Sequence, residues 1–325
     1  MNIVFYFSNK DEHVQEIKNI LEDIQVEHPH KLVEVLIDDD ADIYQEYLGK
    51  TPVIEAGPYH LYSPFTKQDV IMIIGAAKDR QISLEKTNNK EYNKKVERGA
   101  NFTGSDKFTF WLTKHYMMVF NILLFVFVGL PFLAPVLEKS KMHIPANIIY
   151  KIYSPLCHQL GYRSWYLFGE QAAYPRELAG EPGITFEEAT GINSVDVLAA
   201  KNFIGNEKIG YKVAICERDV AIYGGILMFG LIFALSGKKL KSLRWYYWII
   251  LGIVPIAVDG ISQLPALLSI YLRWIPIRES TPLLRTITGL LFGISTAWYG
   301  YPLIEETMRE SRRVLTKKIA VNEIK

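Results

Sequence analysis

Residues 117–136 read MMVFNILLFVFVGLPFLAPV and contain no charged side chain. A helix of about 20 apolar residues is long enough to cross the hydrocarbon core of a bilayer. We therefore expect this stretch to be a transmembrane helix. Its two prolines, Pro131 and Pro135, fall near its far end, where a break in the helix costs least.

Three further apolar stretches follow in the second half of the chain. They cover residues 219–236, 245–268 and 286–303. The middle one reaches the length of a span only when it is extended past Asp259, and Pro255 and Pro265 predict a bent or broken helix there. The sequence therefore predicts an all-α polytopic membrane domain of about four transmembrane helices over residues 117–305.

Glycines recur within two of these predicted spans. They are Gly224, Gly225, Gly230, Gly289 and Gly293. Small residues in membrane helices allow two backbones to approach closely. We expect these glycines to lie at helix–helix contacts.

Basic residues predict the orientation of the spans. The loop at residues 237–244 carries four of them, and the tail at residues 306–325 is also basic. Cytoplasmic loops of membrane proteins are enriched in Lys and Arg. A chain with four spans and with both termini in the cytoplasm places both of these basic segments in the cytoplasm. We therefore expect a multi-pass plasma-membrane protein whose segments 137–218 and 263–283 lie outside.

The N-terminal region has a different, soluble character. Strands are predicted at residues 2–7, 31–37, 51–55 and 59–62, and helices at residues 12–24, 42–48 and 66–79. No basic region precedes the first apolar residues, which predicts a cytoplasmic N-terminus rather than a signal peptide. We expect an α/β domain at residues 1–80 and a polar, lysine-rich linker at residues 81–116.

The order of these elements, with Thr51-Pro52-Val53 opening the third strand, resembles the glutaredoxin branch of the thioredoxin fold. In that family the corresponding proline is cis and lies beside the active site. The family's Cys-x-x-Cys motif is missing, because Asp11 and Val14 stand where the thiols align. Thiol–disulfide exchange requires a thiolate. The resemblance therefore implies a thioredoxin-like domain without that activity, either a binding module with a groove at Thr51 and Pro52 or a folded appendage.

Charge and cysteine content exclude several classes of protein. The net charge of +1 argues against a nucleic-acid partner. The two cysteines, Cys157 and Cys216, are too few for a disulfide-rich scaffold. The expected partners are the lipid bilayer and a redox or membrane protein.

Most of the candidate chemistry falls in segments that the predicted topology brings to one membrane face. These segments are Cys157-His158-Gln159, Cys216-Glu217-Arg218-Asp219, Asp259-Gly260 and Arg278-Glu279-Ser280-Thr281, the last followed by Arg285. Ionisable groups near the bilayer are costly unless they are paired or functional. We therefore expect them to form one site.

The same motifs resemble a family of predicted prokaryotic membrane proteins that is defined only as a domain of unknown function. The resemblance rests on Cys157-His158-Gln159 with Arg163-Ser164, Cys216-x-Arg218 with Tyr223-x-Gly225, Asp259-Gly260-x-x-Gln263-Leu264, and Arg278-Glu279-Ser280-Thr281-x-x-Leu284-Arg285-x-x-Thr288-Gly289. It covers about residues 117–305 and implies a shared site without naming an activity. The stretch at residues 165–212 is longer than the family leads us to expect. For these residues the resemblance therefore implies no functional role.

Two chemical readings of this site remain open. In one, Cys157, His158, Cys216 and Asp259 hold a metal ion, since two thiolates, an imidazole and a carboxylate suit tetrahedral zinc. In the other, the two cysteines form a catalytic or structural disulfide outside the cell, and Arg218 lowers a thiol pKa.

A third reading is structural. The cysteines are then small buried residues, and the charged side chains form an ion network with Arg218 and Asp259. Its remaining members are Asp219, Arg278, Glu279 and Arg285. The function is accordingly open between an enzyme with thiol–disulfide or metal-dependent activity and a non-catalytic scaffold or sensor. The latter would couple the outer site to the cytoplasmic pseudo-thioredoxin domain.

Overall fold

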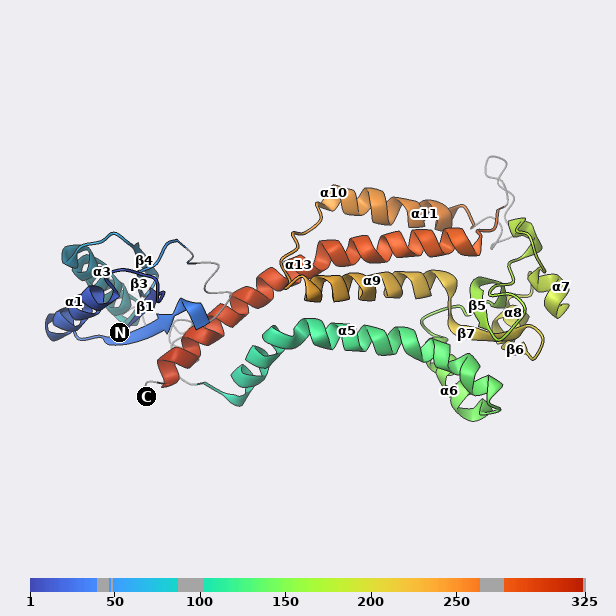
Figure 1. The fold of residues 1–325 in the computed structure, drawn as a ribbon, viewed down its shortest axis with the longest axis horizontal. Coiled ribbons are helices and arrows are strands. Elements are labelled where there is room, and N and C mark those ends of the chain that lie inside the picture. The colour runs from blue at the N-terminus through green and yellow to red at the C-terminus, as the bar shows by residue number, and fades with distance from the viewer. Residues whose placement is uncertain (40–46, 48, 87–101, 264–277, 324–325) are drawn as a thin grey trace. The chain divides into compact units, whose positions relative to one another are not determined.

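The computed structural model describes the chain except for residues 40–46, 48, 87–101, 264–277 and 324–325. It forms two compact units. The first comprises Met1–His115 and Glu306–Lys325, and the second comprises Tyr116–Glu305. Figure 1 shows the elements of both.

The first unit contains a four-stranded sheet with the order β2-β1-β3-β4. Its strands are β1 (Asn2–Phe7), β2 (Lys31–Leu36), β3 (Val53–Ala56) and β4 (Tyr59–Tyr62). β1 pairs parallel with β2 and antiparallel with β3, and β3 pairs antiparallel with β4. All four predicted strands are thus present, within one or two residues of the expected ends. The predicted helix at residues 42–48 falls almost wholly outside the described residues.

Both faces of β1 are buried, which explains its unbroken apolar sequence. Ile3 and Phe5 pack against α1 (Val14–Glu27) and α3 (Lys67–Lys86). Val4 and Tyr6 face a second cluster with Val33 and Val53. Successive residues of β1 point to opposite faces of the sheet, so this one strand contributes apolar side chains to the buried cluster on each face.

The second unit is built mainly of helices. They include α5 (Gly104–Lys139), α9 (Glu217–Leu235), α10 (Trp245–Trp248), α11 (Val254–Ile261) and α13 (Pro282–Glu323), with one π-helical segment at Ile249–Ile253. Two of them, α5 and α13, continue into residues of the first unit. α5 and α9 are long and apolar enough to cross a membrane, whereas Trp245–Ile261 is apolar but shorter. The fourth predicted span lies within α13. The described residues thus contain two candidate membrane helices, and the count of four stays a prediction.

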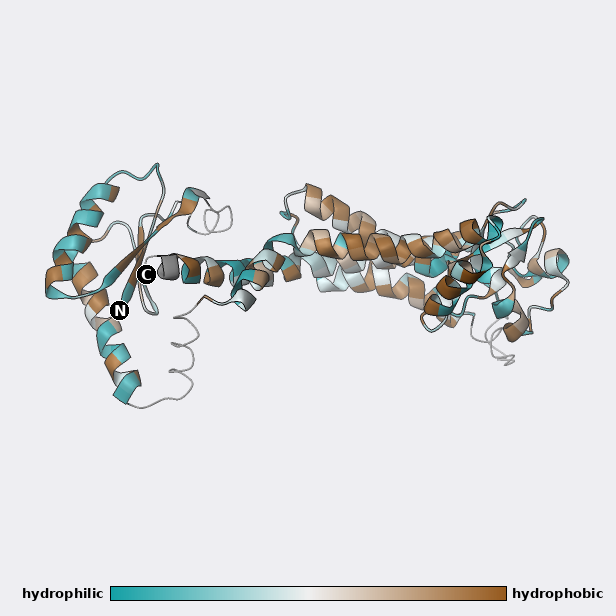
Figure 2. Ribbon diagram, turned by 90° about the horizontal axis from the view of Figure 1, so that it is seen from below, coloured by the Kyte–Doolittle hydropathy of each residue, from teal (hydrophilic) through white to brown (hydrophobic). Residues whose placement is uncertain are grey.

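The apolar side chains of these helices face outward. Only 22% of the most apolar window of α5 and 28% of that of α9 is buried. Figure 2 shows the resulting apolar colouring along the helices of the second unit. Water-soluble proteins rarely expose apolar surface of this extent, whereas lipid accepts it.

A small region between α5 and α9, residues 140–216, is here called the cap. It contains α6 (His143–Tyr153), α7 (Phe186–Thr190) and α8 (Val197–Asn202), and two short 3-10 helices, Gly161–Arg163 and Glu177–Ala179, lie between α6 and α7. It also contains an antiparallel sheet of order β5-β7-β6, formed by β5 (Ser164–Leu167), β6 (Gly205–Asn206) and β7 (Gly210–Cys216).

This sheet corrects the prediction of an all-α domain. Val213, Ala214 and Ile215 of β7 are all buried. Because β7 is covered on both faces, its sequence lacks the alternation that marks a half-exposed strand. It runs directly into α9, whose first three residues, Glu217, Arg218 and Asp219, are charged.

The predicted glycine contacts are confirmed for four of the five residues. A side chain on Gly289 or Gly293 of α13 would meet the backbone of Arg218 or Ile222 in α9, and one on Gly225 would meet Leu290 and Ile294. Gly230 of α9 faces Asn121 of α5 in the same way. Gly224 has open space beside it. Glycine thus sets how closely α9 approaches α13 and α5.

We predict that Gly293→Ala destabilises the protein, because the new methyl group would overlap the backbone carbonyl of Ile222. Overpacking of this kind costs about 1–3 kcal/mol. Gly300→Ala in the same helix is the control, since nothing lies within 4 Å of its added carbon. Thermal unfolding of the detergent-solubilised full chain should show a lower midpoint for the first variant only. Equal midpoints would contradict the close α9–α13 contact.

Candidate functional site

The two cysteines lie side by side where the cap meets α9. Cys157 follows the end of α6 and is held there by a hydrogen bond from its backbone N–H to the carbonyl oxygen of Tyr153, at 3.0 Å. Cys216 ends β7 and caps α9. Its backbone N–H donates to the sulfur of Cys157 at 3.2 Å, and both thiols are free.

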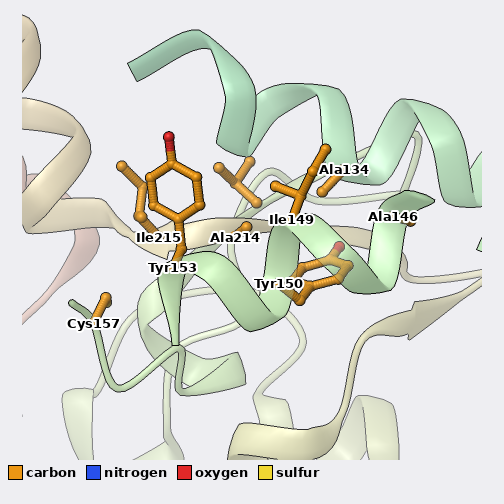
Figure 3. Close-up of a cluster of buried hydrophobic side chains, with 9 residues drawn as sticks. Ala134, Ala146, Ile149, Tyr150, Tyr153, Cys157, Ala214 and Ile215 are labelled. Atoms are coloured by element: carbon orange, nitrogen blue, oxygen red, sulfur yellow. The ribbon is translucent and has the colours of Figure 1, made fainter. Parts of the chain in front are cut away.

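Cys157 belongs to a buried apolar cluster (Figure 3). The cluster joins α6 and β7 through Ile149, Tyr153 and Ile215 and fixes the direction of both chains. The sulfur of Cys157 is therefore placed by packing and not by a flexible loop. Cys216 is less deeply buried, so the pair is open on its side.

A carboxylate completes the group. Asp219 lies in the first turn of α9, and the thiol of Cys216 donates to its Oδ2 atom at 3.1 Å. The ligand atoms of Cys157, Cys216 and Asp219 all lie within 4.8 Å of one another. This separation allows one ion to touch all three, because Zn–S and Zn–O bonds are roughly 2.0–2.3 Å long.

Both the neighbouring sulfur and burial affect the acidity of Cys216. The hydrogen bond with Cys157 raises the pKa of the Cys216 thiol well above its ordinary value, and desolvation and the Asp219 carboxylate act in the same direction. The thiol is therefore protonated at neutral pH. A protonated thiol is a poor nucleophile and has to lose its proton to bind a metal.

The structure does not bring His158, Asp259 or Arg218 to the sulfurs. His158 is exposed, although it follows Cys157 directly. Asp259 accepts hydrogen bonds from Arg218 at 2.5 Å and from Arg278 at 3.3 Å. The carboxylate beside the thiols is Asp219, which we expected in the ion network, and Arg218 is committed to Asp259.

The centre of the ion network is Glu279, whose side chain is fully buried. It pairs with Arg163 at 2.7 Å, with Arg176 at 3.2 Å and with Arg285. Arg285 also pairs with the buried Glu217 at 3.1 Å. Three arginines and two glutamates thus share one dry cluster with a surplus of one positive charge. Removing one partner of a buried ion pair strongly destabilises a protein, because the other charge is then left buried and unpaired.

The Asp259 group is joined to this cluster by one side chain. The amide of Gln263 donates to the backbone oxygen of Asp259 at 2.6 Å, and its Oε1 accepts from Arg285 at 3.5 Å. Asp259 itself is 3% exposed and holds two arginines. The predicted ion network therefore exists as two linked clusters.

The Thr51–Pro52 peptide in the first unit is cis. The Thr51 hydroxyl donates to Asp11 at 3.0 Å, and the Asp11 carboxylate also accepts from the backbone N–H of Ser8 at 2.7 Å. Asp11 stands where a thiol was expected from the alignment. The polar group beside Pro52 is therefore a carboxylate.

Several residues that build the site were not singled out from the sequence. Arg163 and Glu217 lay within the quoted motifs, but nothing in them indicated a shared partner. Arg176 and the buried Lys212 lay in residues 165–212, where the family resemblance gave no guidance. The sequence feature that could have identified them is a charged side chain within a short apolar segment. This feature is weak evidence for a functional residue when the fold is not known.

Comparison with known proteins gives a family for part of the chain. Residues 205–299 match the family described as "Predicted membrane protein (DUF2085)". These residues contain Cys216, Asp219, Asp259 and Glu279. No solved structure matches the chain.

A relative covers a longer stretch. An uncharacterised protein of Methanocaldococcus jannaschii is 27% identical over 203 residues, which is 60% of this chain and 96% of the relative. These similarities and the two apolar helices together indicate that the chain is a membrane protein of unknown function.

Proposed function

We propose that the chain is a multi-pass membrane protein whose cap binds a thiophilic divalent ion of the zinc class through Cys157, Cys216 and Asp219. The observation that carries this proposal is the convergence of two free sulfurs and one carboxylate oxygen within 4.8 Å. Zinc is bound in proteins by cysteine thiolates and by carboxylate oxygens, which are the two kinds of donor present here. Three protein ligands would leave one coordination position open for water or a substrate.

Metal binding fits the raised pKa of the Cys216 thiol better than disulfide exchange does. Exchange begins with thiolate attack, and the raised pKa of Cys216 disfavours the thiolate. A bound cation removes this obstacle because a coordinating thiol is deprotonated outright. Arg218, which the redox reading needs beside a sulfur, is paired with Asp259.

The membrane arrangement is part of the same proposal. We infer four spans in the plasma membrane within residues 117–305, with the N-terminus, the loop at residues 237–244 and the tail at residues 306–325 in the cytoplasm. The outward-facing apolar side chains and the basic loop support it. The cap and its thiols then face outside.

We infer that residues 1–80 are a thioredoxin-like module without thiol chemistry. The strand order, the parallel β1–β2 pair and the cis Pro52 support this inference. Asp11 beside Thr51 makes the groove polar and acidic, which suits a binding role. The alternative to an enzyme is a sensor in which metal occupancy of the cap is read by a partner of this module.

We predict that the purified full-length protein binds one zinc ion per chain. Cys157→Ser and Asp219→Asn should each weaken zinc binding by at least about tenfold, since each removes a ligand. His158→Ala is the matched control, because this exposed neighbour of Cys157 should leave the affinity unchanged. The measurements are elemental analysis and competition with a chromogenic chelator.

Thiol counting on the same sample separates the two chemical readings. Two reactive thiols after metal removal support the metal site. A chain that shows no free thiol until it is reduced would contradict this proposal and support the disulfide. Zinc lost in His158→Ala but kept in Asp219→Asn would contradict the assigned ligands.

We predict opposite labelling on the two sides of the membrane. In a Cys157→Ser, Cys216→Ser background, an impermeant maleimide applied to intact cells should label Lys208→Cys in the cap but not Lys239→Cys in the basic loop. Both positions are exposed in the structure. Labelling of Lys239→Cys alone would overturn the orientation.

A further inference from the structure

Helix α6 carries two apolar faces, of which only one is covered. Ala146, Ile149 and Tyr153 are buried in the cluster with β7 (Figure 3). A second row, spaced by four residues, contains Ile144, Ile148 and Ile152, which are 78%, 53% and 59% exposed. Leu156, in the turn after α6, is 62% exposed. Residues four apart lie on one side of a helix. The row is therefore a continuous apolar stripe on the surface.

The position of α6 in the chain indicates what covers this stripe. α6 begins at His143, shortly after α5 ends at Lys139. If α5 crosses the bilayer, as the proposed function requires, α6 starts at the membrane surface. A helix with one exposed apolar face at that depth is typical of an interfacial helix.

A cavity of about 220 Å³ adjoins α6. Three lysines line it, Lys151, Lys201 and Lys212, together with amide and hydroxyl side chains that include Asn147 and Ser154. Among the described residues that line it there is no aspartate or glutamate. The cavity therefore offers positive charge and hydrogen-bond donors, which suits an anion.

Lys212 has the least ordinary environment of the three. Its side chain is 1% exposed, and its ammonium donates to the carbonyl oxygens of Gln159 at 2.7 Å and Lys201 at 2.5 Å. No carboxylate pairs with it in the part of the chain that the structure describes. Burial lowers the pKa of Lys212 to about 7, although nearby Cys157 opposes this effect. An anion in the cavity would supply the counter-charge that a buried cation requires.

Lys151 connects the cavity to the stripe. It lies three residues after Ile148 and four after Asn147, and residues with these separations are neighbours on a helix surface. The charged cavity and the apolar stripe are therefore adjacent on α6. A ligand that fills both must carry an anionic group next to an apolar chain.

We propose that this site binds the phosphate group of a membrane phospholipid, with the lipid's acyl chain lying along the apolar stripe. Lysine ammonium groups bind phosphate as point charges, and the small neutral donors complete its oxygens. Basic side chains at the membrane surface recognise anionic head groups in this way. The site is separate from the three proposed metal ligands.

The test uses the full-length protein in neutral detergent with short-chain dihexanoyl phosphatidic acid, and binding is followed by calorimetry. We expect Lys151→Gln with Lys201→Gln to weaken binding at least tenfold. Lys212→Met should weaken it too, provided that its thermal midpoint shows a folded protein. Lys208→Gln, an exposed cap lysine outside the cavity, is the matched control. Binding unchanged in the double lysine variant would overturn the proposal.

A second arm distinguishes a lipid from a soluble phosphate. Ile148→Ser with Ile152→Ser should weaken binding of the short-chain lipid and leave binding of glycerol 3-phosphate unchanged. Glycerol 3-phosphate that binds as tightly as the lipid, with no effect of the serine variants, would overturn the assignment to a phospholipid. Because zinc is absent from both arms, neither result depends on the metal site, and zinc binding can fail while lipid binding succeeds.

Discussion

The pairing of buried Glu279 with three arginines is the constraint on which the cap depends. Arg163 and Arg176 come from the cap, and Arg285 comes from the start of α13. The Arg285 and Arg176 side chains are 2% and 9% exposed, so these two cations depend most on the glutamate, whereas Arg163 is 19% exposed. Hydrophobic packing alone would allow the cap to slide against the helices, because apolar contacts have no preferred direction. The charged cluster removes that freedom.

The same cluster positions the thiol site through the first turn of α9. Glu217 points to Arg285, Arg218 to Asp259 and Asp219 to the Cys216 thiol. Successive helical residues point about 100° apart, so three adjacent charged side chains serve three different partners. Once Glu217 is fixed, the helix phase determines where the other two side chains lie. The carboxylate of Asp219 therefore reaches the sulfurs, and Arg218 does not.

The different directions of these three side chains also explain a limit of prediction from the sequence. The sequence predicted which residues belong to the site better than it predicted which of them contact one another. The metal and disulfide readings of the sequence placed Asp259 and Arg218 at the thiols, whereas the structural reading placed both in an ion network, where the structure pairs them. Correct assignment needs the direction of each side chain in the first turn of α9, and this depends on buried partners such as Arg285 that lie far away in the sequence. The strands of the first unit were easier to predict because turn residues separate them. The charged residues of the cap, such as Arg176, needed a partner more than 100 residues away.

The loop after α6 is the element that the thiol site and the lysine cavity share. The Gln159 carbonyl accepts from Lys212, and its side-chain amide donates to the backbone oxygens of Tyr150 and Ala214 at 2.9 and 2.7 Å. Cys157 lies two residues before it, and Lys212 and Cys216 lie on the same strand. The pairing of β7 with β5 shifts register between these two residues, with Tyr166 opposite Lys212 and Ser164 opposite Cys216. Because the side chains of Gln159 and Lys212 tie this loop to α6 and β7, a ligand in the cavity and an ion at the sulfurs would both bind beside the same hydrogen-bonded loop.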